Sequence, residues 1–239
     1  MTDPLIVPGT ASDIDSLRQP LVAGSLQVQQ QVIPQLANLG DVGLDVLMEF
    51  LYERRENPAT SVDGKAYQVL YNSDSLKAKE FLQTYFPSGI VPLTSDCGID
   101  YSPLQQLLAA CDFQAADRMT LQKMCEVAGP AAVQRKWLYF TEAENFPVTD
   151  LRTINTLWLV HSDGKFGFSV QREIWLGLGK NWDNLWTKIG WKNGNNWTRY
   201  PNEFTWNLSA PRGHLPLSNQ LRGVRVIASL LSHPAWVNS

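Results

Sequence analysis

The 25 residues from Trp182 to Trp206 read WDNLWTKIGWKNGNNWTRYPNEFTW and hold five of the nine tryptophans of the protein. Tyr200 and Phe204 add two further aromatic rings to this stretch. From Lys188 onward the chain carries six Lys or Arg residues and a single acid. Aromatic rings beside cations indicate either a binding surface for a flat anionic ligand or a tightly filled core with polar edges.

The composition is typical of a soluble, globular protein. The chain has 239 residues, of which 44% are hydrophobic and 18% charged. This length allows one large domain or two smaller ones. No run of 18 apolar residues predicts a membrane-spanning helix. The first 15 residues are acidic and broken by prolines, unlike a secretory signal or a transit peptide, so we expect a cytoplasmic compartment.

Cysteines and charge exclude several classes of protein. Cys97, Cys111 and Cys125 stand 14 residues apart, an odd set that fits neither a disulfide framework nor a zinc site. We interpret them as small buried residues. Residues 1–88 carry six bases and eleven acids, and residues 89–239 carry fourteen bases and twelve acids. Neither half has the strongly basic balance that is typical of gene-regulatory nucleic-acid binding.

A shift in composition predicts two domains. Every tryptophan lies at or after Trp137. The Pro- and Gly-containing residues 87–99 are predicted to be the linker. We therefore expect an N-terminal antiparallel helical bundle in residues 1–88 and a second, all-helical domain in residues 89–239.

Apolar periodicity places the helices of the first domain. We predict helices over Ser25–Leu39, which Gly40 ends, and over Gly43–Arg55. The second of these has its apolar face at Leu44, Leu47, Phe50 and Leu51. A last helix is predicted to be capped by Asp74 and to end at Phe86.

The helices of the second domain follow from residues that suit helix starts. The predicted N-caps are Ser102, Asp112, Asp150 and Ser169. Further helices are predicted over Gln134–Phe140, Thr141–Asn145, Asp183–Ile189 and Leu217–Leu231. Between the last two, residues 190–216 show no helical period, and a loop of this length is usually functional.

No pattern of catalytic residues is evident. There is no G-x-S-x-G string, and His161, His214 and His233 are scattered. The aromatic stretch contains only Asp183 and Glu203 as acids, whereas a glycosidase needs two carboxyl groups across one bond. Gly-rich residues 190–194 match neither a Walker loop nor a dinucleotide fingerprint. The sequence therefore favours a binding protein over an enzyme.

Several longer strings carry a family resemblance. They are GIDYSPL (98–104), WLYFTE (137–142), FGFSVQ (166–171), KIGWK (188–192) and NQLRGVR (219–225). Together they resemble the Gun4 (genomes-uncoupled) family over residues 89–233. The first 88 residues are similar only in kind, as the helical bundle of cyanobacterial members.

The resemblance implies a fold and a role. It implies an all-α protein whose core domain is shaped like a cupped hand and holds porphyrin between two mobile loops. One would be the aromatic loop, and the other would lie in residues 119–133. The implied role is that of a non-catalytic regulator that binds protoporphyrin IX or Mg-protoporphyrin IX and stimulates magnesium chelatase in chlorophyll biosynthesis. The implied partner is the large, porphyrin-binding chelatase subunit. We expect a monomer that binds no nucleic acid, and peripheral association with photosynthetic membranes is compatible with this role.

The resemblance also implies the site residues. They are Phe113, Leu121, Trp197, Tyr200, Phe204, Asn219, Arg222 and Arg225. Tyr200 stands where relatives have Trp, and Leu121 where some have Arg. Aromatic walls would remove the porphyrin disc from water, and arginines at the rim would pair with its propionates. We expect no catalytic residue and no protein metal ligand, because water suits magnesium as an axial ligand.

Alternative interpretations stay open at this level. The tryptophans would fill an ordinary helical core, or the aromatic loop would bind haem, a bilin, a carbohydrate or single-stranded nucleic acid. An enzyme acting on a tetrapyrrole is a further alternative. Haem carriage requires an axial ligand, for which His214 is the histidine within the aromatic region. Within the stretch, we predict that Trp182, Trp186 and Trp191 anchor the loop and that residues 197–204 form its mobile wall.

Overall fold

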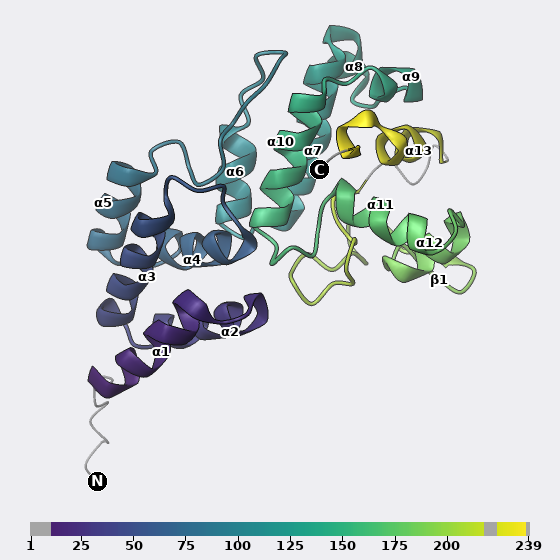
Figure 1. Ribbon diagram of the computed structural model, residues 1–239. Coiled ribbons are helices and arrows are strands. Elements are labelled where there is room, and N and C mark those ends of the chain that lie inside the picture. The colour runs from purple at the N-terminus through teal and green to yellow at the C-terminus, as the bar shows by residue number, and fades with distance from the viewer. Residues whose placement is uncertain (1–10, 218–223, 238–239) are drawn as a thin grey trace. The chain divides into compact units, whose positions relative to one another are not determined.

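The computed structural model describes residues 11–217 and 224–237 and divides into two compact units, Met1–Ile90 and Val91–Ser239 (Figure 1). Each unit is described here by itself. Among the described residues, no helix is both long enough and apolar enough to cross a membrane.

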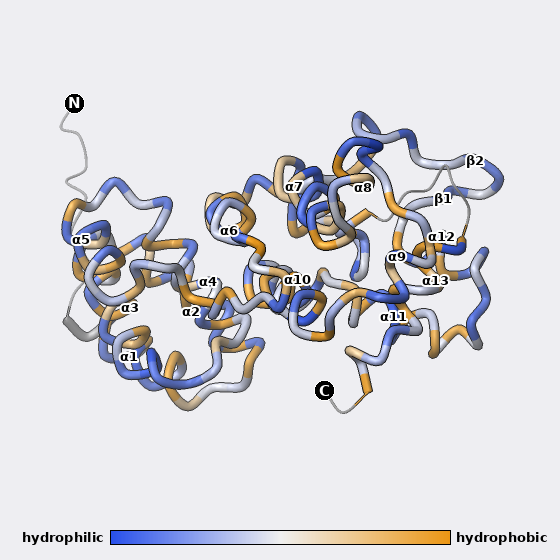
Figure 2. The backbone as a smooth tube through the Cα atoms, turned by 90° about the horizontal axis from the view of Figure 1, so that it is seen from above, coloured by the Kyte–Doolittle hydropathy of each residue, from blue (hydrophilic) through white to orange (hydrophobic). Residues whose placement is uncertain are grey.

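The first unit is a bundle of short helices. They are α1 (Ala11–Ala23), α2 (Leu26–Ala37), α3 (Asp41–Arg54), α4 (Ser61–Tyr71) and α5 (Leu76–Tyr85). Helix α2 packs against α1, α3 and α4, and α5 packs against α3 and α4. The predicted apolar face of α3 is buried. In Figure 2 hydrophobic and hydrophilic segments alternate along the helices of this unit. The predicted helices and their one-sided core are confirmed.

The cap of the last helix in this unit differs from the prediction. The side chain of Ser75, not that of Asp74, accepts a hydrogen bond from the backbone N–H of Ala78. Both residue types suit a cap, and they are neighbours. The local sequence therefore does not distinguish between the two start positions.

The second unit contains eight further α-helices and a hairpin among the described residues. They are α6 (Ser102–Ala109), α7 (Phe113–Ala128), α8 (Pro130–Arg135), α9 (Phe140–Glu144), α10 (Val148–Val160), α11 (Phe168–Gly177), α12 (Trp182–Lys188), β1 (Lys192–Asn193), β2 (Asn196–Trp197) and α13 (Arg225–Ser232), followed by the 3-10 turn η2 (Pro234–Trp236). In Figure 1 α13 lies beside α9 and α11, and it contacts both helices.

The hairpin was not predicted. Strands β1 and β2 are antiparallel, with Lys192 opposite Trp197 and Asn193 opposite Asn196. Gly194, with φ of 58°, and Asn195 form its two-residue turn. Its tip is hydrophilic in Figure 2. Because this is the only sheet among the described residues, the prediction of an all-α fold is confirmed.

Three predicted N-caps in the second unit are wrong. Ser102 lies in the first turn of α6, and its N–H donates to Asp100. The cap position of α10 is taken by Pro147 instead of Asp150, and that of α11 by Gly167 instead of Ser169. Only Asp112 caps its helix as predicted, with a bond of 2.9 Å from the N–H of Ala115.

Asp150 is engaged in tertiary contacts, which explains why it does not cap α10. Its carboxylate accepts hydrogen bonds from the Ser95 hydroxyl, from the Asp96 N–H at 2.9 Å and from the Tyr101 hydroxyl at 2.8 Å. This buried carboxylate ties the chain before α6 to α10. A partner this distant in the sequence cannot be read from local helix signals.

The predicted helix over Gln134–Phe140 is also wrong. Helix α8 ends at Arg135 because Lys136 is left-handed, with φ of 62°. The predicted helix over Leu217–Leu231 begins later, since Leu217 is irregular and α13 starts at Arg225. Residues 218–223 lie outside the described residues.

Candidate ligand-binding site around the aromatic loop

Stacked tryptophans form the base of the site. Ring centroids are separated by 4.8 Å between Trp175 and Trp182, 5.3 Å between Trp182 and Trp186, and 5.4 Å between Trp186 and Trp191. The last two rings are parallel within 5°. Trp186 and Trp191 are buried. For these residues the core interpretation holds, and they link α11 and α12 to the start of the loop.

His214 closes the loop, here defined as residues 190–217, at its neck. Its backbone oxygen accepts a bond of 2.8 Å from the Trp191 indole. Its Nδ1 lies 2.7 Å from the Ile189 oxygen, and its Nε2 accepts from the Thr205 N–H at 3.3 Å. These partners require a neutral ring with the proton on Nδ1. Burial lowers the pKa of His214, which agrees with the neutral form. With both nitrogens engaged, His214 is a structural residue in this arrangement.

The end of the loop is fastened to α11. The side-chain amide of Gln171 donates to the backbone oxygens of Gly213 at 3.0 Å and of Pro216 at 2.8 Å. The N–H of Gly167, at the start of α11, donates to the oxygen of Leu215 at 3.0 Å. The chain entering residue 217 is therefore held along several consecutive residues.

The middle of the loop has its own aromatic cluster. The ring centroids of Tyr200, Phe204 and Trp206 are 5.6 to 5.8 Å apart in every pair. Phe204 also lies 4.9 Å from the His214 ring and is 6% exposed, whereas Tyr200 is 41% exposed. Phe204 thus supports the cluster from within, and Tyr200 presents a ring to the outside.

Trp197 presents a second aromatic surface. It lies on β2, is 45% exposed and is tilted against Trp186 at 5.9 Å. The ammonium of Lys192 is 5.7 Å from the centre of its ring and pairs with Asp183 at 2.9 Å. Lys192 and Trp186 therefore orient the ring of Trp197 and leave much of it exposed.

Helix α7 meets the loop at two charged residues that the sequence analysis did not single out. The Tyr200 hydroxyl interacts with the carboxylate of Asp117 and with the guanidinium of Arg118. Asp117 also accepts a bond of 2.6 Å from the N–H of Leu217. Burial raises the pKa of Asp117 to about 7, and the bonds from Leu217 and Tyr200 act in the opposite direction. One sequence signal was available: Asp117 follows Phe113 by four residues, which puts a carboxylate on the apolar face of α7.

The remaining predicted site residues are placed differently. Phe113 is buried at the start of α7, stacked on Trp158 at 6.1 Å and edge-on to Phe166 at 5.7 Å. Leu121 is half-buried, one turn beyond Asp117. Tyr200 and Phe204 thus lie together in the loop, and Leu121 lies on α7. Phe113 belongs to the helical core.

The arginines of the predicted rim are only partly described. Arg225 is exposed at the start of α13, with its guanidinium 5.4 Å from the centre of the Phe140 ring. Asn219 and Arg222 lie outside the described residues.

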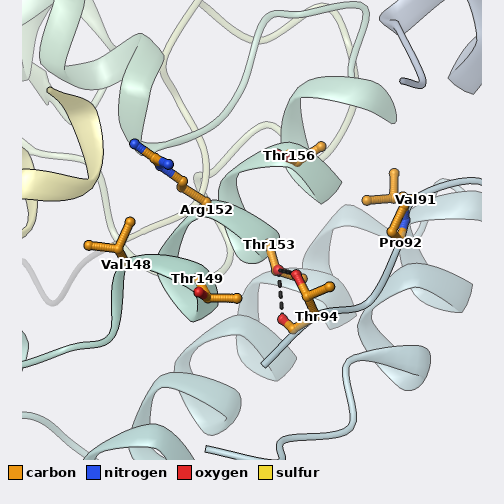
Figure 3. A pocket seen from close by; sticks show the side chains of 8 residues that line it. All are labelled: Val91, Pro92, Thr94, Val148, Thr149, Arg152, Thr153 and Thr156. Carbon is orange, nitrogen blue, oxygen red and sulfur yellow. Dashed lines mark hydrogen bonds between the residues drawn. The ribbon is translucent and has the colours of Figure 1, made fainter. Parts of the chain in front are cut away.

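A groove elsewhere in the second unit is separate from these residues. It has a volume of about 290 Å³ and is lined by Val91, Pro92, Thr94, Val148, Thr149, Arg152, Thr153 and Thr156 (Figure 3). Thr153 bonds the backbone oxygen of Thr94 at 2.7 Å, and Arg152 donates to the oxygen of Ala235 at 2.9 Å. Among the predicted site residues that the structure describes, none lines this groove.

Comparisons with known proteins agree with the resemblance. A GUN4-like family model matches residues 94–234, and a model described as an ARM-like repeat domain, GUN4-N terminal, matches residues 5–87. The Ycf53-like protein of a Synechocystis species is 52% identical over 228 residues, which are 95% of this chain and 97% of that protein. The chloroplastic tetrapyrrole-binding protein of Arabidopsis thaliana is 37% identical over 148 residues, 58% of this chain and 56% of that protein.

A solved structure agrees with the fold. The structure of GUN4 from Chlamydomonas reinhardtii aligns with a TM-score of 0.58 and 42% identity, and covers 61% of this chain and 93% of that chain. The family matches, the relatives and this likeness together show that the chain belongs to the GUN4-like family, in its cyanobacterial form with an ARM-like N-terminal domain.

Proposed function

We propose that this protein binds protoporphyrin IX and Mg-protoporphyrin IX without covalent attachment and acts as a non-catalytic regulator that stimulates magnesium chelatase in chlorophyll biosynthesis. Membership of the GUN4-like family supports the proposal, as does the name of the Arabidopsis relative, a tetrapyrrole-binding protein. The partner proposed for this chain is the large chelatase subunit, which handles the same porphyrins.

One observation carries the proposal: two exposed aromatic rings, Trp197 and Tyr200, are presented by a loop that is fastened at both ends. A porphyrin is a rigid apolar disc with two carboxylates at one edge. Aromatic faces favour stacking on such a disc, and guanidinium groups favour its carboxylates. Arg118 beside Tyr200 supplies a cation at the edge of the aromatic surface.

We propose that the stacking surfaces contribute most of the affinity. An exposed ion pair between an arginine and a propionate contributes about 0–1 kcal/mol, whereas burying an apolar disc contributes in proportion to the area removed from water. The proposed site keeps the predicted set, with Leu121 on α7 and Phe204 inside the loop. Arg222 and Arg225 are the proposed partners of the propionates, and Asn219 stays in the set. In this arrangement Phe113 supports the site through the helical core.

The engagement of the nearby carboxylates supports a non-catalytic role. Among the described residues of the stretch, Asp183 pairs with Lys192 at 2.9 Å, and Glu203 accepts the N–H of Arg199 at 2.8 Å. Asp117 is engaged with Tyr200 and Leu217. Acid–base catalysis needs a carboxyl group within reach of the bound ligand. We propose that the protein presents or receives porphyrin at the large subunit and shields the ring meanwhile, in the cytoplasm beside photosynthetic membranes.

Fluorescence titration tests the binding step. We expect a water-soluble porphyrin to quench tryptophan emission saturably at micromolar concentration. Trp197→Leu should weaken binding severalfold, because it removes one stacking surface. Tyr85→Leu is the matched control, since Tyr85 is 46% exposed but lies in the other unit. Unsaturable quenching by the parent protein would refute the proposal.

A chelatase assay tests the regulatory step. Magnesium insertion by the reconstituted chelatase should be faster with the parent protein than with Trp197→Leu. Porphyrin incubated with the protein alone should be recovered unchanged, as judged by its mass and absorption spectrum. Turnover in that control would instead support the enzyme alternative. Single-strand nucleic-acid binding, the other alternative, would fall steeply with added salt, whereas stacking of porphyrin in an apolar site would change little.

A further inference from the structure

We propose that Asp117 is a positioning residue of the porphyrin site, whose buried carboxylate holds the Tyr200 ring and the end of the aromatic loop against α7. This inference rests on the proposed function and assigns a role to a residue outside the predicted site.

The geometry joins three segments at one side chain. Asp117 is 4% exposed, in the middle of α7. It accepts a bond of 2.6 Å from the N–H of Leu217, which lies 100 residues further along the chain. Its carboxylate also interacts with the hydroxyl of Tyr200 from the middle of the loop. Two points of the loop that are distant in sequence are thereby held at one place on α7.

The exposed ring of Tyr200 keeps one orientation only if its hydroxyl or its edges are fixed. A phenol at the surface rotates about its side-chain bonds unless its hydroxyl or its edges are fixed. Phe204 and Trp206 contact the ring edges, and Asp117 fixes the hydroxyl. A ring that is already oriented loses less entropy when a flat ligand stacks on it. Asp117 therefore acts on the ligand through Tyr200.

Arg118 is held by the same arrangement. It follows Asp117 directly and is exposed, and its side chain interacts with the Tyr200 hydroxyl. The guanidinium is thus kept at the edge of the ring, where a carboxylate of a stacked porphyrin would approach. Leu121, one turn further along α7, is apolar and carries no charge. Arg118 supplies the charge from the neighbouring turn.

The groups that face Asp117 make its role dependent on pH. They are Arg118 from its own helix, Tyr200 from the loop and the Leu217 N–H. The ionised carboxylate accepts the bond from Leu217 and attracts the Tyr200 hydroxyl, whereas protonation weakens both contacts and turns one oxygen into a donor. Burial raises the pKa of Asp117 to about 7. Porphyrin affinity should consequently fall as the pH is lowered from 8 to 6.

Hydrogen exchange in the ligand-free full-length protein tests the positioning role directly. Asp117→Asn should speed exchange at Leu217 and across residues 200–206. The matched control is Asp150→Asn, since Asp150 is 1% exposed and accepts three hydrogen bonds in the same unit. The control should speed exchange near Ser95–Tyr101 and leave the loop unchanged. Equal loop protection in Asp117→Asn and the parent would overturn the positioning role.

Porphyrin titration tests the consequence for the ligand. We expect Asp117→Asn to bind about tenfold more weakly at pH 8, the effect of losing one charged hydrogen bond, and to show no change between pH 8 and 6. Tyr200→Phe, which removes the same bond from the other side, should act alike. The double variant should be no weaker than the weaker single variant.

The outcomes separate this inference from the proposed function. A parent protein that does not bind porphyrin would overturn both. A parent that binds, with Asp117→Asn matching its affinity and pH dependence, would overturn the role of Asp117 alone. Additive losses in the double variant would also overturn it. If Asp117→Asn does not fold, Tyr200→Phe provides the same comparison of affinity and loop exchange.

Discussion

The indole nitrogen of Trp191 donates a hydrogen bond of 2.8 Å to the backbone oxygen of His214, 23 residues further along the chain. Trp191 is fully buried and parallel to Trp186, so this bond joins the neck of the loop to the tryptophan stack. The exposed rings of Trp197 and Tyr200 are carried on the chain between these two residues. A surface made of an irregular segment therefore has a fixed base.

Replacing Trp191 tests this base. Trp191→Phe removes the donor to the His214 oxygen and leaves a small cavity in the core. We expect a loss of about 2–4 kcal/mol in the free energy of unfolding, measured by chemical denaturation. Trp197→Phe is the control at an exposed ring and should change the same quantity by about 0.5 kcal/mol or less. A similar loss in both variants would show that the neck has no special importance.

Gly213 tests how closely the loop approaches α11. Its φ is 81°, and an added Cβ would lie 2.8 Å from Ile174 Cδ1 and 3.0 Å from Ile189 Cγ2. We expect Gly213→Ala to destabilise the protein by about 2–4 kcal/mol, from backbone strain plus overpacking. Gly194→Ala, at φ of 58° with nothing within 4 Å, should lose only the strain, about 1 kcal/mol. Equal losses in thermal unfolding would exclude the packing contribution.

His161 predicts acid sensitivity. It is fully buried, with Nδ1 2.9 Å from the Leu157 oxygen, and burial lowers its pKa to about 4. The unfolded chain binds a proton near pH 6.5, so the free energy of unfolding falls as the pH drops from 6.5 to 4. The full effect is about 3 kcal/mol.

Comparison with His161→Asn isolates this effect, because the amide can still donate to Leu157 but does not titrate. Urea unfolding of both proteins between pH 4.5 and 7.5 gives the difference. A parallel acid dependence in the two proteins would mean that His161 does not contribute.

The predicted domain boundary leads to a test by truncation. A fragment of residues 89–239 should fold alone, unfold cooperatively and bind porphyrin with the affinity of the full chain, because the site residues all lie within it. Circular dichroism and fluorescence titration are the measurements. A fragment that is unfolded would place part of its core in residues 1–88.

Local sequence predicted the helices better than their ends. The apolar face of α3 is where its periodicity puts it, because the period of a helix is an intrinsic property of the backbone. The start of α5 was misplaced by one residue, since Asp74 and Ser75 both suit a cap. The start of α10 was misplaced because Asp150 binds Ser95, Asp96 and Tyr101 instead. Competition from distant partners decides such cases.

The candidate site was likewise predicted only in part. The sequence alone identified the stretch Trp182–Trp206, its anchoring tryptophans and an all-helical class, because composition and period are local properties. Only the tertiary structure decided that Phe204 is buried while Tyr200 is exposed, and that Asp117 meets Tyr200 and Leu217. Burial and hydrogen bonding depend on which distant segments pack together, and the free energy of that packing belongs to the whole unit.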